Sequence, residues 1–259
     1  MVKKILRIVL WVVTAVALIM LFTFGRKKYL ETPLKGVEFQ LERSHSNGFV
    51  VKDSVLTQVK GICGIERHAA IATVDMMKIS QLLNSNPWIE SANAYIGLND
   101  TLFVKAKEYE PVLRVFTKDK KSVYVTKDGY LVPFCRHYAP RVIIANGEFQ
   151  FPNIHKGANV NDSIYAYTGL SDALVIAKAI EKDPFLIGAI GQIYKNENNE
   201  YELMVNGLSA NVVLGDTCHV DNKLSRLAIL LERYSGTEEL KAYKTLDLKY
   251  KNQIVCTKK

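Results

Sequence analysis

Hydrophobic and polar positions divide the chain into stretches of different pattern. Residues 8–24 hold no charged side chain, and eleven of these seventeen residues are Leu, Ile, Val or Phe. Further on, apolar residues alternate or recur at helical spacing, and from residue 111 they form short runs between polar turns. We expect a cytoplasmic tail at 1–7, a transmembrane anchor at 8–24, a linker at 25–34, a first domain at 35–110 and a second at 111–259.

The uncharged run is at the short end of what crosses a hydrocarbon core of about 30 Å. Its apolar residues favour insertion by about 3 to 7 kcal/mol. A cleaved signal peptide is the first alternative, but Ala15-Val16-Ala17, the one close match to a cleavage site, lies in the middle of the run. A buried core helix is the second. The anchor positions are Ile8, Trp11, Leu18 and Phe24.

Orientation does not follow from charge, because three basic residues flank the run on each side. We expect the arrangement usual for such an anchor, with the N-terminus in the cytoplasm and everything after Phe24 exported.

The first domain is predicted to have the order strand, helix, helix, strand, strand. Residues 35–43 alternate as in a half-buried strand, and Asp53 and Asp75 are candidate caps of two helices. Asn86-Pro87 ends the second helix, since proline cannot donate a hydrogen bond. Residues 89–96 and 101–109 are predicted to form a hairpin.

The second domain is predicted to be a larger mixed sheet with flanking helices, so the whole chain is of the α+β class. Helices are expected near 172–182 and 221–234, and residues 146–170 are expected to form a long loop. Asn206-Gly207 predicts a type I′ hairpin turn. Strands are expected at 112–116, 122–125, 130–132, 142–145, 187–194, 200–205, 209–214 and, as one terminal strand, about 244–255.

The net charge of +8 belongs mainly to the flanks of the anchor. The first 28 residues hold six basic and no acidic residues, which leaves +2 for residues 29–259. Anionic lipid headgroups attract such flanks. A nucleic-acid-binding protein would carry a basic stripe on its folded part, so we expect no nucleic acid partner.

Candidate chemistry is sparse, and we expect no enzyme, cofactor, metal or small-molecule substrate. Cys135-Arg136-His137 and Cys218-His219 are the close Cys/His pairs, and a zinc site would need both to converge. Asp216 fits a turn carboxylate better than a catalytic group. Free buried thiols are expected for Cys63, Cys135, Cys218 and Cys256, with one disulfide as the alternative.

Several motifs, in order along nearly the whole chain, resemble the FtsQ/DivIB family of bacterial cell-division proteins. The strand, helix, helix, strand, strand unit behind one anchor resembles a POTRA domain. The motifs are Asn86-Pro87-Trp88-Ile89-Glu90-Ser91-Ala92, the run from Leu102 to Val112, Tyr124-Val125-Thr126-Lys127-Asp128-Gly129, Lys182-Asp183-Pro184-Phe185, Leu214-Gly215-Asp216 and the ending from Leu246 to Gln253.

The resemblance implies a non-enzymatic scaffold of the divisome in the plasma (inner) membrane, enriched at the division septum. It implies that FtsB-like and FtsL-like partners bind by strand addition and that the protein helps to regulate septal peptidoglycan synthesis. The last strand receives the partner in that family, with Tyr250 at its aromatic contact. The implied partner-binding residues are Leu248, Tyr250, Lys251, Asn252, Gln253, Ile254 and Val255.

One departure and two alternatives stay open. Asn198-Asn199-Glu200 stands where some members carry an arginine on the binding face. A POTRA-containing component of a transport or outer-membrane assembly system would show repeated POTRA units or a barrel. An anchored hydrolase would lose turnover on substitution of Asp216 or Cys218.

Overall fold

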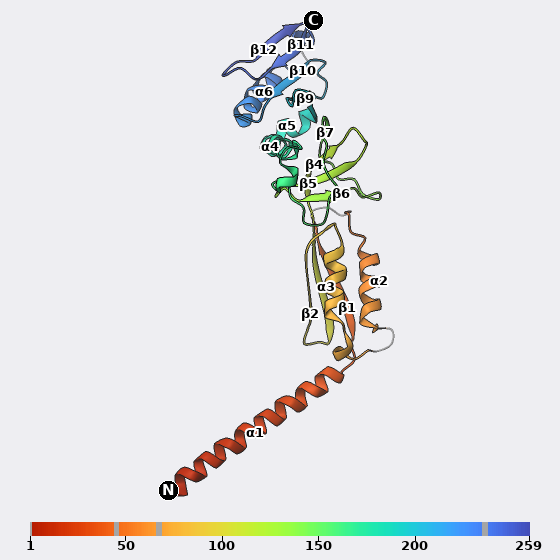
Figure 1. The fold of residues 1–259 in the computed structure, drawn as a ribbon, viewed down its shortest axis with the longest axis vertical. Coiled ribbons are helices and arrows are strands. Elements are labelled where there is room, and N and C mark those ends of the chain that lie inside the picture. Colours follow the sequence, from red (N-terminus) through yellow and green to blue (C-terminus); the bar gives the residue numbers. More distant parts are fainter. Residues whose placement is uncertain (1, 44–46, 66–68, 235–237) are drawn as a thin grey trace. The chain divides into compact units, whose positions relative to one another are not determined.

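The computed structural model describes residues 2–43, 47–65, 69–234 and 238–259 (Figure 1). Its contacts divide the chain into two units. Unit 1 comprises Met1–Glu42 and Val50–Glu108, and unit 2 comprises Arg43–Phe49 and Tyr109–Lys259. The fold is mixed α+β with an apolar N-terminal helix and a large mixed sheet, which confirms the predicted class.

The apolar run lies in one long helix, α1 (Val2–Glu31). The helix continues past Phe24 through Arg26, Lys27 and Lys28, which are good helix formers. Residues 25–34 therefore differ from the expected linker. Leu30 already packs against the core of unit 1, and Leu34 is buried within that core.

The rest of unit 1 has the predicted order of strands and helices. Strands β1 (Gly36–Glu42), β3 (Thr101–Glu108) and β2 (Ile89–Ile96) lie in the order β1-β3-β2, with β1 parallel and β2 antiparallel to β3. Helices α2 (Lys52–Cys63) and α3 (Met76–Ser85) and the 3-10 turn η2 (Ile71–Thr73) complete it. The main buried side chains are Phe39, Val59, Ile79, Leu83, Leu102 and Val104.

One of the two predicted helix caps in unit 1 is correct. The Asp75 carboxylate accepts a hydrogen bond from the backbone N–H of Lys78 at 3.0 Å, so Asp75 caps α3. Asp53 is wrong as a cap, because α2 begins at Lys52 and Asp53 lies inside its first turn. There its charge still opposes the positive end of the helix dipole.

Unit 2 is built on a nine-stranded sheet within the described residues, in the order β12-β11-β10-β9-β8-β7-β4-β5-β6. Its strands are β4 (Pro111–Phe116), β5 (Ser122–Thr126), β6 (Leu131–Pro133), β7 (Ile143–Gly147), β8 (Ile190–Lys195), β9 (Tyr201–Val205), β10 (Asn211–Gly215), β11 (Tyr243–Asp247) and β12 (Val255–Lys258). Its helices are α4 (Leu170–Glu181), α5 (Pro184–Ala189), α6 (Val220–Tyr234) and α7 (Glu238–Lys241), with the 3-10 turn η3 at Ser163–Tyr165.

The core of unit 2 lies between the sheet and helices α4 and α6. Alternate strand residues such as Leu113, Ala145, Ile193, Leu203 and Val212 are fully buried, which is the period-two pattern of a sheet covered on that side. Burying one Leu or Ile side chain contributes about 1.5 to 3 kcal/mol. The apolar faces of α4 and α6 supply the opposing layer.

Three sequence predictions in unit 2 are wrong. The strand expected at 187–194 begins only at Ile190, because Asp183 caps the short helix α5 and Pro184 starts it. Asn206 lacks the positive φ of a type I′ turn, and five residues separate β9 from β10. The terminal strand expected at 244–255 is two strands, β11 and β12, joined by a turn.

Candidate functional site

Strand β12 is an edge of the large sheet and, among the described strands, pairs only with β11. Its four residues, from Val255 to Lys258, are all exposed. An edge strand presents unpaired backbone N–H and C=O groups along its free side, and these groups are a template for another strand. The opposite edge, β6, is covered in part, since the Leu131 N–H donates to the carbonyl of Ala158 at 2.8 Å.

The direction of the β12 backbone groups follows from one hydrogen bond. The N–H of Lys259 donates to the carbonyl of Ala242 at 3.0 Å, toward the β11 side. Backbone groups alternate in direction along an antiparallel strand. The N–H groups of Cys256 and Lys258 therefore face the free edge, and that of Thr257 faces β11.

The turn between β11 and β12 is held by Arg226 of helix α6. The Arg226 guanidinium donates to the carbonyl of Tyr250 at 2.8 Å, to that of Leu248 at 3.1 Å, and to that of Gln253. Arginine suits this role because its planar fork presents several donors in fixed directions. One helix side chain thus satisfies three carbonyls that no strand pairing reaches.

Lys249 fixes the beginning of the same turn. Its N–H donates to the Asp247 carboxylate at 2.9 Å, and its ammonium lies 3.1 Å from a carboxylate oxygen of Glu200. The hydrogen bond to Glu200 raises the pKa of the Lys249 ammonium. Asn252 turns the chain with a φ of 57°, a left-handed conformation that Asn tolerates.

The predicted partner-binding residues separate into three groups. Leu248 is fully buried, so it supports the fold and makes no contact at the surface. Ile254 packs against the core of unit 2, and Val255 begins β12 with 40% of its surface exposed. The exposed residues of the turn, outside any strand, are Tyr250, Lys251, Asn252 and Gln253.

Sequence reasoning missed Cys256, Thr257 and Lys258, which form most of the edge strand. A signal was present in the sequence: the polar segment from Lys249 to Gln253 interrupts two apolar runs, and its Asn252 favours a turn.

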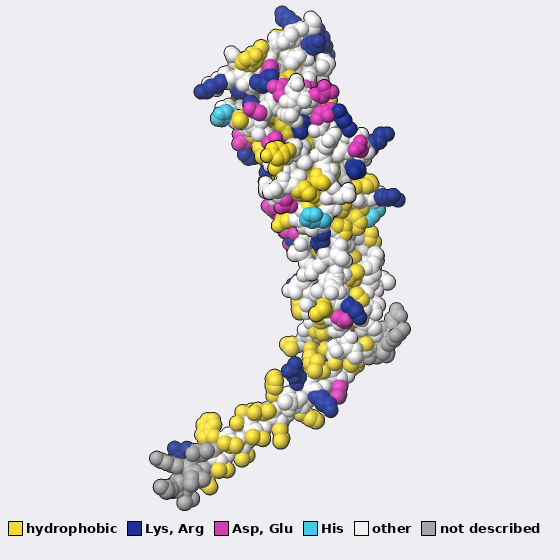
Figure 2. All heavy atoms as spheres, in the orientation of Figure 1, with side chains coloured by type: hydrophobic (Ala, Val, Ile, Leu, Met, Phe, Trp, Pro, Cys, Tyr) yellow, Lys and Arg dark blue, Asp and Glu magenta, His cyan; other side chains and the backbone are white. Residues whose placement is uncertain are grey.

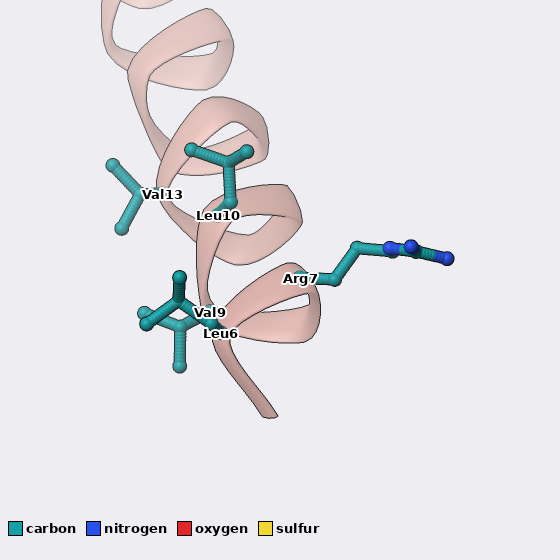
Figure 3. A pocket seen from close by; sticks show the side chains of 5 residues that line it. All are labelled: Leu6, Arg7, Val9, Leu10 and Val13. Atoms are coloured by element: carbon teal, nitrogen blue, oxygen red, sulfur yellow. The ribbon is translucent and has the colours of Figure 1, made fainter. Parts of the chain in front are cut away.

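The predicted anchor residues lie on α1, whose segment Val9–Glu31 is long and apolar enough to cross a membrane, and no residue of its most apolar eighteen-residue window is buried. Trp11, Leu18 and Phe24 are exposed, as lipid-facing side chains would be; the side chain of Ile8 is outside the described part. Figure 2 shows hydrophobic side chains along α1 and basic side chains near the end where it stops. A shallow groove on α1 is lined by Leu6, Arg7, Val9, Leu10 and Val13, and Arg7 extends away from Leu6, Val9 and Val13 (Figure 3).

The residues considered for a metal site or for thiol chemistry contact only near neighbours or the backbone. Cys135 Sγ lies 3.2 Å from His137 Nδ1, and His137 Nε2 lies 2.8 Å from the carbonyl of Phe49. Within the described residues, no group of three or more His, Cys, Asp or Glu side chains could hold a metal ion. All four cysteines are free, as expected. Cys63 and Cys135 are buried, but Cys218 and Cys256 are exposed, so the expectation of buried thiols is wrong for these two. Burial raises the pKa of the Cys63 thiol to about 11.

Asp216 forms an ion pair with a buried lysine. Its carboxylate lies 2.7 Å from the ammonium of Lys223, a side chain only 7% exposed, and accepts a hydrogen bond from the N–H of Cys218 at 3.2 Å. The hydrogen bond from Lys223 lowers the pKa of the Asp216 carboxyl. These contacts give Asp216 a structural task at the start of α6.

Comparison with known families finds a match to unit 2. No curated protein matches the chain. The family model described as FtsQ/DivIB, C-terminal related, matches residues 110–257, which is more than half of the chain and includes β11, the Arg226-bound turn and most of β12. The chain therefore belongs to the FtsQ/DivIB C-terminal related family.

Proposed function

We propose that this protein is a single-pass membrane scaffold of bacterial cell division that binds FtsB-like and FtsL-like partners by strand addition at β12. Through them it helps to regulate septal peptidoglycan synthesis. The proposal includes a cytoplasmic N-terminus, an exported body and enrichment at the septum. Unit 1 beyond α1 is proposed to be a POTRA domain, on the basis of its strand, helix, helix, strand, strand order.

The single observation that carries this proposal is the free edge of β12 in the family-matched unit. Strand addition obtains affinity from backbone hydrogen bonds and specificity from side chains on alternate positions. The outward N–H groups of Cys256 and Lys258 supply the backbone hydrogen bonds. Tyr250, half exposed in the adjoining turn, is an aromatic side chain available for the specific contacts.

Basic side chains near this edge support a partner strand over self-association. Lys251 lies in the turn, and Lys258 lies on β12 itself. Charged residues on an edge strand discourage pairing between identical copies. A partner strand that carries acidic residues at matching positions would remove this repulsion.

The absence of catalysis is part of the proposal. The strongest candidate residue, Asp216, is engaged with Lys223, and its lowered pKa keeps it ionised, which suits an ion pair more than an acid catalyst. We propose no small-molecule substrate and no nucleic acid partner.

The test uses the full chain in lipid nanodiscs and an immobilised FtsB-like partner. Deleting residues 246–259 would be ambiguous, because Leu246 and Leu248 belong to the core. Cys256→Pro removes one N–H that faces the free edge, a position where proline is tolerated in edge strands. Cys256→Ser is the matched control, since it keeps the N–H and changes the same side chain.

We expect Cys256→Pro to weaken partner binding at least about tenfold, equivalent to about 1.4 kcal/mol, and Cys256→Ser to bind like the parent. Circular dichroism and thermal unfolding would verify that both variants are folded. A folded Cys256→Pro variant that binds normally would rule out strand addition at β12. Uniform envelope fluorescence of a fusion protein in dividing cells, without a midcell band, would rule out the division role.

A further inference from the structure

Helix α1 joins the folded part of unit 1 without a flexible linker. The N–H of Ile71 donates to the carbonyl of Thr32 at 2.9 Å, and the N–H of Leu34 donates to that of Ala69 at 3.1 Å. Leu30, six residues after Phe24, packs into the core. At 1.5 Å per helical residue, the core of unit 1 begins only about 9 Å beyond the end of the apolar run.

The turn between β2 and β3, residues 97–100, lies at the end of unit 1 that α1 joins. The N–H of Lys35 donates to the carbonyl of Asp100 at 2.8 Å, and the Lys35 ammonium lies 2.9 Å from the Asp100 carboxylate. The N–H of Gly97 closes the turn on the carbonyl of Thr101 at 2.9 Å. Figure 1 shows this turn at the end of the sheet from which β1 starts.

Large apolar side chains are exposed at this end. Leu98, at the tip of the turn, is fully exposed, and Met77, in the first turn of α3, is 71% exposed. An isolated exposed leucine is ordinary on a protein surface. What distinguishes Leu98 is its position two residues before Asp100, which is bonded to Lys35 close to the membrane anchor.

The charges at this end suit an anionic lipid surface. Asp100, the acidic residue of the tip, is only 14% exposed at its side chain and is paired with Lys35. Lys35 remains 65% exposed, and Arg26, Lys27 and Lys28 precede it on α1. Basic residues beside a membrane span are attracted to anionic headgroups, and Tyr29, 39% exposed, has the amphipathic ring typical of the interface.

We propose that the β2–β3 turn is a second membrane contact, in which Leu98 enters the headgroup region of an anionic bilayer beside α1. This inference rests on the proposed membrane anchor. The contact fixes unit 1 at two points, α1 and the turn, and so restricts its rotation about the anchor.

The experiment places a fluorescent probe on the full chain in vesicles of equal phosphatidylcholine and phosphatidylglycerol. Cys218→Ser and Cys256→Ser remove the exposed thiols, and Cys63 and Cys135 are buried. An NBD probe is attached at Asn99→Cys, next to an intact Leu98. The control probe is at Val51→Cys, an exposed residue at the start of α2. This helix has twelve residues and spans about 18 Å, and its other end lies near Ala69, so residue 51 is far from the end of unit 1 that α1 joins.

We expect nitroxide-labelled lipid to quench the probe at residue 99 and not at residue 51, and Leu98→Ser to abolish most of the quenching at residue 99. Equal quenching by aqueous iodide at both positions, with no lipid quenching at residue 99, would overturn the membrane contact. Vesicle flotation separates the two proposals. If the chain floats with the vesicles but residue 99 is unquenched, only this inference fails; if it does not float, the anchor fails as well.

Discussion

The guanidinium of Arg226 lies 2.8 Å from the backbone carbonyl oxygen of Tyr250. The two residues belong to helix α6 and to the turn between β11 and β12. Through this contact, and those with Leu248 and Gln253, the helix determines the path by which the chain reaches β12. The proposed binding edge thus depends on a residue that is not part of it.

Arg226→Lys should loosen the turn. A lysine ammonium cannot reproduce the fork of donors, and losing charge-assisted hydrogen bonds at a partly exposed site should cost about 1 to 2 kcal/mol of unfolding free energy. Hydrogen exchange should quicken at the amides of residues 249–256. Arg233→Lys on the same helix, where Arg233 stacks over the Tyr234 ring at 5.7 Å, is the control and should change stability by less than about 0.5 kcal/mol. Unchanged hydrogen exchange in Arg226→Lys would mean that the turn keeps its conformation without the Arg226 hydrogen bonds.

Asp216→Asn should remove an acid-sensitive part of the stability. The pKa of Asp216 is lowered in the folded protein by Lys223, so its contribution is complete above the unfolded pKa of about 4 and is lost as the pH falls through the lower, folded value. The variant should lose about 1 kcal/mol at pH 7: the buried Lys223 loses its carboxylate, but the Asp216 side chain is itself 69% exposed, so solvent screens part of the interaction. Urea unfolding at several pH values measures both effects.

The control for Asp216 is Asp221→Asn. Asp221 pairs with Lys182 at 2.8 Å, but both side chains are about two-thirds exposed, so the loss should be about 0 to 1 kcal/mol. Equal losses from the two variants would contradict a special role of the buried lysine. The Asp216 variant also tests the hydrolase alternative, since a catalytic Asp216 would show in lost turnover without lost stability.

Gly169→Ala should destabilise unit 2 more than Gly157→Ala. Both glycines have a φ of 81°, so both substitutions carry the cost of a left-handed conformation, about 1 to 2 kcal/mol. At Gly169 the new methyl group would also lie 2.8 Å from the Lys195 ammonium and 2.9 Å from the Tyr201 hydroxyl, whereas nothing lies within 4 Å at Gly157. We expect an additional loss of about 1 to 3 kcal/mol from this crowding. Equal unfolding midpoints for the two variants would disprove it.

Leu18→Arg should release the protein from the membrane. An arginine at the centre of a span costs about 2.5 to 3.5 kcal/mol on insertion, against about 3 to 7 kcal/mol that the apolar run supplies. Membrane fractionation should show the variant shifted to the soluble or degraded pool, while Leu18→Ala stays with the membrane. Full retention of Leu18→Arg would indicate that α1 is held by contacts other than lipid.

The elements of unit 1 were predictable because their signals are local. Alternation in β1 and the hairpin of β2 and β3 are direct consequences of residue order, and Asp75 with Asn86-Pro87 bounds α3 from both sides. Asp53 failed as a cap because the N–H of Val55 already bonds to the carbonyl of Val51, so the helix starts two residues earlier.

The candidate site was predictable only in outline. An apolar run such as Phe185–Ile190 fits a strand or a helix until the cap at Asp183 decides. The division between β11 and β12 depends on Arg226, more than twenty residues earlier in the chain, and no local pattern around Tyr250 reveals that contact. The buried position of Leu248 is likewise a property of the assembled sheet.

The parallel pairing of β7 has a consequence for how unit 2 folds. β4 with β5 and β6, and β8 with β9 and β10, are antiparallel runs of neighbouring strands, whereas β7 joins them through two parallel pairings, Leu113 with Ile143 and Ile144 with Gln192. Parallel pairing closes longer loops and slows folding. We expect Ala145→Gly, at a fully buried position of β7, to slow refolding in stopped-flow measurements more than it speeds unfolding. β10 and β11 are also parallel, with Val212 opposite Leu246, but Ile144 and Gln192 are further apart along the chain. The rate at which the sheet becomes continuous is then set mainly at β7, far along the sheet from the edge at β12.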